Sequence, residues 1–187
     1  AVEDVRAVVA EHRWDALAPL LDTAAVGGAS AAMDYPWALH LLAHIYNGSL
    51  AEATALWKRV PLVARKASDV HAVHELLQLC WSRRYSDIWA VLQLGVSSWD
   101  GSLRPLARAL LQRKRAELIE MLLEAYSTIK PSKVASMCGL SEADAIAACC
   151  GRGWQLSIDG SLLLSPTRAQ ACSQGAAPQV PSLVHSS

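Results

Sequence analysis

The feature that most constrains this chain is a helical hairpin pattern that repeats along the sequence. Residues 37–46 are apolar on nearly every face of a helix, and Asn47-Gly48 is expected to end that helix. A second helix is predicted over 50–60, with Ser49 as its capping residue and Pro61 immediately after it. Two helices separated by so short a break predict a helical hairpin.

The same pattern recurs at an offset of 35 residues, and residues 5–21 offer a third copy. The matched pairs are Leu41 and Leu76, Leu42 and Leu77, Tyr46 and Trp81, Leu50 and Tyr85, and Ala53 and Ile88. Two helices per unit at this period predict a tetratricopeptide-like solenoid, in which each hairpin buries one face against its neighbour. An irregular helical bundle is the alternative.

A long helix is expected after Asp100-Gly101-Ser102. Its predicted buried stripe consists of Leu103, Leu106, Leu110, Leu118, Met121, Leu122 and Ala125. The basic cluster 113–115 on its outer face is interpreted as a solvated face that the following glutamates balance.

The pattern changes after Ile129. A short helix is predicted over 131–138, ended by Gly139, and a second over 142–150, capped by Ser141. The predicted inner face of the second helix is Ala143, Ile146, Ala147 and Cys150, with Ala145 and Cys149 outside. Two alternating segments around Asp159-Gly160 then predict a β-hairpin, so this region is expected to form a winged helix.

The predicted fold class is therefore mainly α: a helical-hairpin solenoid followed by a winged-helix subdomain with a small β-wing. We expect a helical-repeat region at 1–126 and the winged-helix subdomain at 127–165. Residues 166–187 are rich in Ala, Ser, Pro and Gln without periodicity, which is typical of a flexible tail.

Composition excludes several classes of function. Seventeen basic residues balance seventeen acidic ones, and the second winged-helix segment carries Glu142 and Asp144, so direct nucleic-acid binding is not expected. A winged-helix nucleic-acid-binding regulator remains the alternative from another class. Apolar runs are too short to span a membrane. Five irregularly spaced cysteines predict reduced thiols and an intracellular protein.

Histidines occur in two close pairs, His40 with His44 and His71 with His74. His40 and His44 have the spacing of metal ligands on a helix, but no third ligand is evident. Leu41 occupies the position where a zinc peptidase carries its catalytic Glu. We therefore expect no catalytic, metal-binding or cofactor-binding residues, and a histidine-ligated metal hydrolase is a minor alternative.

The wing offers a candidate surface for a protein partner. If Asp159-Gly160 occupies the centre of the turn, Leu163 joins Trp154, Leu156 and Ile158 on one face, and Leu162 and Leu164 lie on the other. An exposed apolar strand edge is suited to strand addition by another chain. The candidate interface residues are Trp154, Leu156, Ile158, Leu162 and Leu164; a register that buries every leucine is the alternative.

Helical hairpins leading through a long helix into a winged helix resemble the PCI domain. Within that family, the segments YPWALHLL (35–42), ALWKRVP (55–61), WSRRYSDI (81–88) and AYSTI (125–129) resemble the small eighth subunits of the COP signalosome in their plant-like or algal form. Gly153-Trp154 adds to the resemblance, which is collinear over about residues 30–165.

The resemblance implies a non-catalytic scaffold subunit of the complex that removes the ubiquitin-like modifier Nedd from cullin-RING ligases. It further implies a cytoplasmic and nuclear hetero-oligomer whose winged-helix sheet joins other PCI subunits edge to edge. Related subunits of the proteasome lid or of translation initiation factor three are the alternatives within the class. Family members usually end in a helix that joins a multi-subunit bundle, and the Pro- and Ser-rich tail shows no such pattern.

Overall fold

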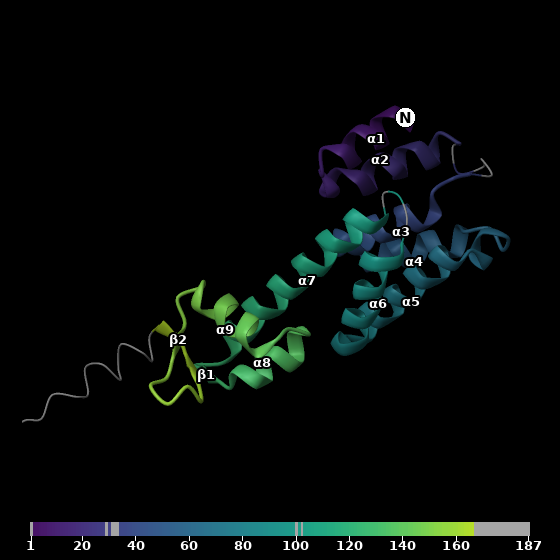
Figure 1. The fold of residues 1–187 in the computed structure, drawn as a ribbon. Coiled ribbons are helices and arrows are strands. Elements are labelled where there is room, and N and C mark those ends of the chain that lie inside the picture. The colour runs from purple at the N-terminus through teal and green to yellow at the C-terminus, as the bar shows by residue number, and fades with distance from the viewer. Residues whose placement is uncertain (1, 29, 31–33, 100, 102, 167–187) are drawn as a thin grey trace, which may run out of the picture. The chain divides into compact units, whose positions relative to one another are not determined.

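The computed structural model describes residues 2–28, 30, 34–99, 101 and 103–166, so the predicted tail lies outside the described residues except for Pro166. The elements are α1 (Val2–Ala10), α2 (Trp14–Val26), α3 (Trp37–Tyr46), α4 (Leu50–Arg59), the 3-10 helix η2 (Ala64–Lys66), α5 (Ser68–Ser82), α6 (Tyr85–Ser98), α7 (Leu103–Ala125), β1 (Thr128–Ile129), α8 (Pro131–Cys138), α9 (Glu142–Cys150), β2 (Gln155–Leu156) and β3 (Leu163–Leu164) (Figure 1). Within these residues, no helix has the length and apolar character that crossing a membrane requires.

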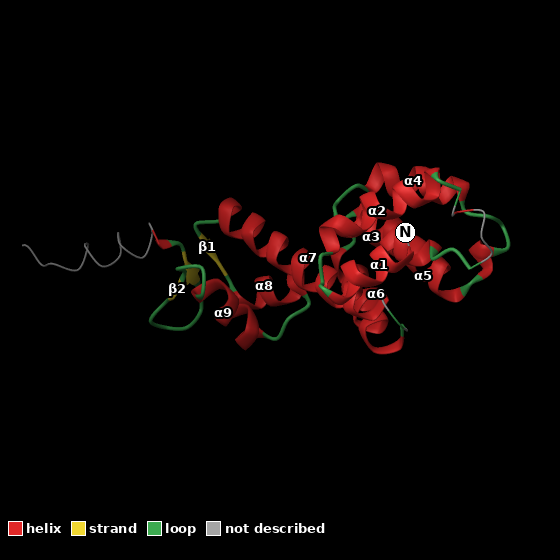
Figure 2. Cartoon of the chain, turned by 90° about the horizontal axis from the view of Figure 1, so that it is seen from above, coloured by secondary structure: helices red, strands yellow, loops and turns green. Residues whose placement is uncertain are grey.

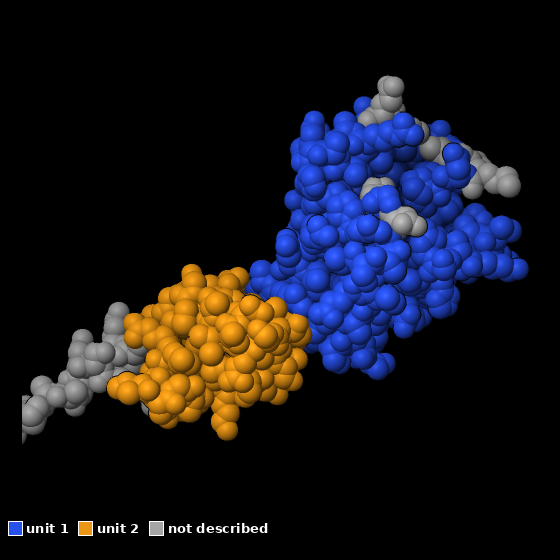
Figure 3. Space-filling view, in the orientation of Figure 1, with its two compact units in different colours: residues 1–116 blue, residues 117–187 orange. Residues whose placement is uncertain are grey.

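The chain divides into two compact units, residues 1–116 and 117–187 (Figure 3). The sequence pattern predicts a boundary at 126/127, after the long helix, whereas this division falls inside α7. The reason is that Leu118, Ile119 and Leu122 are buried and belong to the second unit. The last turns of α7 therefore supply part of the second unit's core.

Unit 1 is built from three consecutive helical hairpins, α1 with α2, α3 with α4, and α5 with α6, in its described part (Figures 1 and 2). Helix α2 packs on α3, and α3 and α4 both pack on α5, so each hairpin contacts the next. Residues that match across the 35-residue offset occupy equivalent buried positions: Leu41, Leu76 and Ala53 are fully buried and Ile88 is 2 % exposed. The sequence repeat thus corresponds to a repeat in packing.

The hairpin turns share a backbone feature. His12, Gly48 and Arg83 each have a positive φ, of 55°, 76° and 53°, and each lies just after the first helix of its hairpin. A left-handed residue at this place ends a helix and lets the chain reverse. Helix α4 begins after Ser49 as predicted, but the Ser49 side chain makes no capping hydrogen bond.

The first half of α7 completes unit 1. Leu106 and Leu110 are fully buried, as the predicted stripe requires. Arg113, predicted to belong to a solvated face, instead bonds Asp15 of α2 at 2.8 Å and lies over the ring of Tyr46 in α3, 4.7 Å from its centre. This cation therefore takes part in packing the helix onto the hairpins.

Unit 2 contains α8, α9 and an antiparallel sheet of three strands within the described residues, in the order β1-β3-β2. Leu163 pairs with Leu156 on one side and with Ile129 on the other. The predicted two-stranded wing was incomplete, because β1 was not recognised. Met121 and Ala125 were predicted to be buried but are exposed on the last turns of α7.

The inner face of α9 differs from the predicted one. Ala145 and Cys149 are fully buried, whereas Ala143, Ala147 and Cys150 are exposed. The helix begins as expected, since the Ser141 hydroxyl accepts a hydrogen bond from the Asp144 backbone N–H at 3.1 Å. A helix made largely of Ala and Cys has little contrast in hydrophobicity around its circumference, so its sequence pattern did not fix which face turns inward.

Replacing Gly48 with alanine is expected to destabilise unit 1 by about 1 kcal/mol, because an L-residue is strained at this positive φ. A Cβ at Gly48 would meet no atom within 4 Å, so the cost isolates backbone strain. The measurement is chemical denaturation followed by circular dichroism. Gly27→Ala is the control, since Gly27 has φ −72° and only ordinary contacts; equal losses in both variants would contradict the explanation.

Candidate protein interface

The outer edge of β2 is the candidate interface in unit 2. The Ser157 N–H donates to the Leu162 carbonyl at 2.8 Å, so the backbone groups of these two residues face each other across the hairpin. Antiparallel pairs alternate, and the next pair, Leu156 with Leu163, is therefore of the non-hydrogen-bonded kind. The N–H and C=O of Leu156 consequently point away from β3, toward the edge of the sheet.

The predicted register is confirmed, because Leu156 lies opposite Leu163 and Gln155 opposite Leu164. Leu163 is fully buried. The alternative in which every wing leucine is buried is therefore wrong, since Leu156 is 40 % exposed.

The candidate interface residues do not all reach the surface. Trp154 is 5 % exposed, so it belongs to the core of unit 2 and is unavailable to a partner as the structure stands. Ile158 is fully exposed at the turn after β2, whereas Leu162 and Leu164 are only partly exposed. The accessible apolar groups at this edge are therefore Leu156 and Ile158.

Strand β1 explains why β3 is less available than expected. It pairs with β3 on the side away from β2, with Thr128 opposite Leu164. The two-residue length of β1 gives almost no alternation to detect in a sequence. The open edge on the hairpin itself is consequently that of β2.

Hydrogen bonds to one carboxylate organise the turn between β2 and β3. Asp159 accepts bonds from the Ser157 hydroxyl at 2.5 Å, the Ser161 hydroxyl at 2.7 Å and the Ser161 N–H at 3.2 Å. The hydroxyl oxygen of Ser157 in turn accepts a hydrogen bond from the Leu162 N–H at 3.0 Å. The hydroxyl of Ser157, followed by that of Ser161, lowers the pKa of Asp159 to about 2. The turn that presents Ile158 is thereby held in one shape.

The charge on the exposed face of α9 is acidic at its start, where Glu142 and Asp144 are exposed. Arg152, just beyond its end, pairs with Glu120 and donates to the Ala148 carbonyl. An acidic helix with its nearby cation already engaged offers phosphate groups little attraction. This surface is better suited to a protein than to nucleic acid.

The two histidine pairs of unit 1 have different surroundings. His40 and His44 are buried and approach each other to 3.2 Å between their Nε2 atoms. Asp22, which sequence analysis did not connect with them, contacts both rings. His71 is exposed, and His74 instead stacks on Trp57 with ring centres 3.7 Å apart, where burial lowers the His74 pKa.

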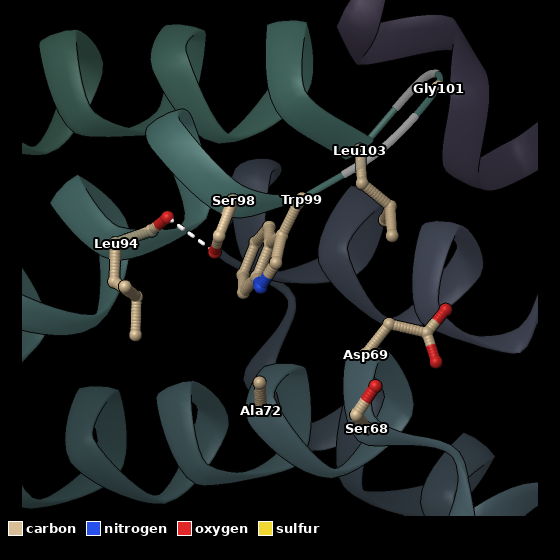
Figure 4. Close-up of a pocket in the computed structure, with 8 residues that line it drawn as sticks. All are labelled: Ser68, Asp69, Ala72, Leu94, Ser98, Trp99, Gly101 and Leu103. Carbon is tan, nitrogen blue, oxygen red and sulfur yellow. Dashed lines mark hydrogen bonds between the residues drawn. The ribbon is translucent and has the colours of Figure 1, made fainter.

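Unit 1 also has a pocket of about 690 Å³ beside Trp99 (Figure 4). Its described lining consists of Ser68, Asp69, Ala72, Leu94, Ser98, Trp99, Gly101 and Leu103. The Ser98 hydroxyl donates to the Leu94 carbonyl at 2.7 Å, so it is engaged by its own helix. Asp69 is the one ionisable group in this lining, which lacks the paired groups that acid-base catalysis uses.

Replacing Ser157 with alanine is expected to raise the Asp159 pKa toward its ordinary value of 3.8, because the strongest hydrogen bond to the carboxylate is lost. Since the folded pKa is depressed, the ionised carboxylate stabilises the turn above pH 3.8, and this stabilisation is lost as the pH falls through about 2. Carboxyl chemical shifts measured against pH give the midpoint. Ser161→Ala should raise it less; an unchanged midpoint in Ser157→Ala would refute the arrangement.

Comparisons with known proteins place this sequence in a family. The chain is 26 % identical over 172 residues to the COP9 signalosome complex subunit 8 of Arabidopsis thaliana, covering 89 % of this chain and 85 % of that protein. It is 25 % identical over 119 residues to the subunit of the same name from Xenopus tropicalis, covering 63 % and 61 % of the two chains. A family profile matches residues 32–172, which include the α3–α6 hairpins and the sheet of unit 2. The chain therefore belongs to the CSN8/PSMD8/EIF3K family.

Proposed function

We propose that this chain is a non-catalytic scaffold subunit of the COP9 signalosome, the complex that the family resemblance connects with removal of Nedd from cullin-RING ligases. The relatives from a plant and from vertebrates carry the name of its subunit 8. The family match covers residues 32–172, which include parts of both compact units, so the proposal draws on the helices from α3 onward and on the sheet. In this role the chain acts in the cytoplasm and nucleus and binds other subunits through its surface. Another subunit carries out the catalytic reaction.

The observation that carries the proposed mode of assembly is the orientation of Leu156. We infer that α8, α9 and the sheet of unit 2 form a winged-helix subdomain, with β2 and β3 as its wing. A strand from another signalosome subunit adds to β2, because the Leu156 N–H and C=O face outward and the sheet order leaves β2 at an edge. The exposed side chain of Ile158 supplies adjoining apolar contact.

The shortness of β2 favours pairing of its outer edge with a strand of a partner over leaving that edge exposed to water. A sheet of two-residue strands contributes few ladder hydrogen bonds, and an added strand would satisfy the outward groups of β2. The neighbouring turn needs no rearrangement, since Asp159 and the two serines already fix it. The partner therefore meets a preorganised edge, which lowers the entropy lost on binding.

Leu156→Pro is expected to weaken assembly about tenfold more than Leu156→Ala does, since only proline removes the outward N–H. The β2–β3 ladder does not use that N–H, so both variants should retain the circular dichroism spectrum and melting temperature of the parent chain. The measurement is co-expression with the other signalosome subunits, followed by affinity capture and mass spectrometry. Failure of the unmodified chain to capture any signalosome subunit would overturn the proposed function itself.

A second pair of variants tests the apolar contact. Ile158→Ser should reduce capture of signalosome subunits, whereas Val26→Ser replaces another strongly exposed apolar residue, in unit 1, and should not. Equal capture by both variants, together with equal capture by Leu156→Pro and Leu156→Ala, would place the interface elsewhere while leaving the subunit assignment intact.

A further inference from the structure

Three side chains from two helices converge at one point in unit 1. The Asp22 Oδ1 atom of α2 lies 3.0 Å from His40 Nε2 and 3.3 Å from His44 Nε2, and the two Nε2 atoms are 3.2 Å apart. His40 and His44 stand one turn apart on α3, so both rings emerge on the side where α2 packs. His40 is fully buried, His44 is 4 % exposed and the Asp22 side chain is half exposed, so the cluster opens to solvent at the carboxylate.

The position of the proton on His40 follows from Tyr35. The Tyr35 hydroxyl donates to the Leu21 carbonyl at 3.1 Å, and its oxygen lies 2.8 Å from His40 Nδ1. A hydroxyl has one proton and a carbonyl can only accept, so for both contacts to be hydrogen bonds the Tyr35 oxygen accepts from His40 Nδ1–H. Neutral His40 therefore presents a lone pair at Nε2.

The three contacts within the cluster cannot all be hydrogen bonds. A neutral His40 with its proton at Nδ1 has only a lone pair at Nε2, and a carboxylate oxygen of Asp22 can only accept a hydrogen bond. A neutral His44 carries one proton, which at Nε2 could serve either Asp22 or His40 but not both well. In at least one of the three contacts, two lone pairs therefore point at each other at hydrogen-bonding distance with no proton between them.

The spacing fits a metal ion. Zinc binds imidazole nitrogen and carboxylate oxygen at about 2.0–2.2 Å in tetrahedral geometry, which sets ligand atoms about 3.3–3.6 Å apart. The three observed separations, 3.0, 3.2 and 3.3 Å, lie at or slightly below the short end of that range, so small side-chain shifts would accommodate the ion. Two imidazoles favour a transition metal over Mg²⁺ or Ca²⁺, which prefer all-oxygen ligands. An outer hydrogen bond that orients a ligating histidine, here from His40 to Tyr35, is a regular feature of such sites.

We propose that Asp22, His40 and His44 bind one divalent transition-metal ion such as Zn²⁺, with water in the remaining position on the exposed side of Asp22. The ion joins α2 to α3 and so fastens the first helical hairpin to the second. Its role is structural, and it is independent of the signalosome assignment, because neither the sheet of unit 2 nor any partner contributes a ligand.

The test uses the full chain after dialysis against a chelator. Titration with Zn²⁺ should reach about one equivalent per chain, and saturating Zn²⁺ should raise the melting temperature by several degrees, since the ion binds only the folded state. Mg²⁺ at the same concentration should have no effect. Co²⁺ should bind in its place and give the visible absorption of a nitrogen- and oxygen-ligated centre.

Variants separate the site from adventitious histidine binding. Asp22→Asn and His44→Gln should each weaken Zn²⁺ binding about a hundredfold, and Tyr35→Phe about tenfold through the orientation of His40. His71→Gln removes an exposed histidine and should leave affinity unchanged. Circular dichroism verifies that each variant folds. If His44→Gln does not fold, Asp22→Asn still tests the site, because it changes a half-exposed side chain and leaves the core unaltered. Absence of saturable binding, or an equal loss in His71→Gln, would overturn the proposal.

Discussion

The packing of unit 1 depends on α3 having no solvent-facing side. Residues 37–45 are all buried, and the helix contacts α2, α4 and α5. A helix that is apolar all round must be surrounded by other helices, so the hairpins on both sides of α3 in the sequence are drawn to it. Arg113 of α7 reaches the ring of Tyr46 at the end of the same helix. This burial explains why hairpins that are individually too small to hold a core form a single compact unit.

The same constraint makes the two polar residues of α3 unusual. Leaving an imidazole unpaired in a core costs free energy, and His40 and His44 therefore need partners that the flanking segments supply. Tyr35 precedes the helix and reaches His40, while Asp22 approaches from α2. Leucine at either position would satisfy burial without any partner. Two histidines and a carboxylate placed together, where simple packing would be easier, are better explained by a ligand they share than by mutual hydrogen bonding.

How much of the structure the sequence could predict depended on the contrast in hydrophobicity between neighbouring positions. The hairpins were predictable because Asn47-Gly48 and Pro61 interrupt long helical segments and the pattern repeats after 35 residues, and the strand register because Asp159-Gly160 marks a turn between alternating segments. Helix α9 was placed correctly along the chain but rotated wrongly, since Ala145 and Cys149 hardly differ from Ala147 and Cys150 in hydrophobicity. Strand β1 was not predicted, because a strand of two residues is too short to show the alternation of apolar and polar residues. Asp22 could not be joined to His40 from sequence, because that contact exists only once α2 packs on α3.

The small sheet of unit 2 is held in place by the core beneath it and not by the hydrogen bonds at its outer edge. Strands of two residues hold together weakly on their own, so the sheet depends on Trp154, Ile129 and Leu163, which are buried in unit 2. With the inner face fixed by that core and the turn fixed by Asp159, the outer edge of β2 needs no hydrogen bonds of its own to keep its shape. Its backbone groups remain available because stability was secured elsewhere. If the proposed partner strand adds to β2, it meets an edge that is already rigid, and this lowers the entropy lost on binding.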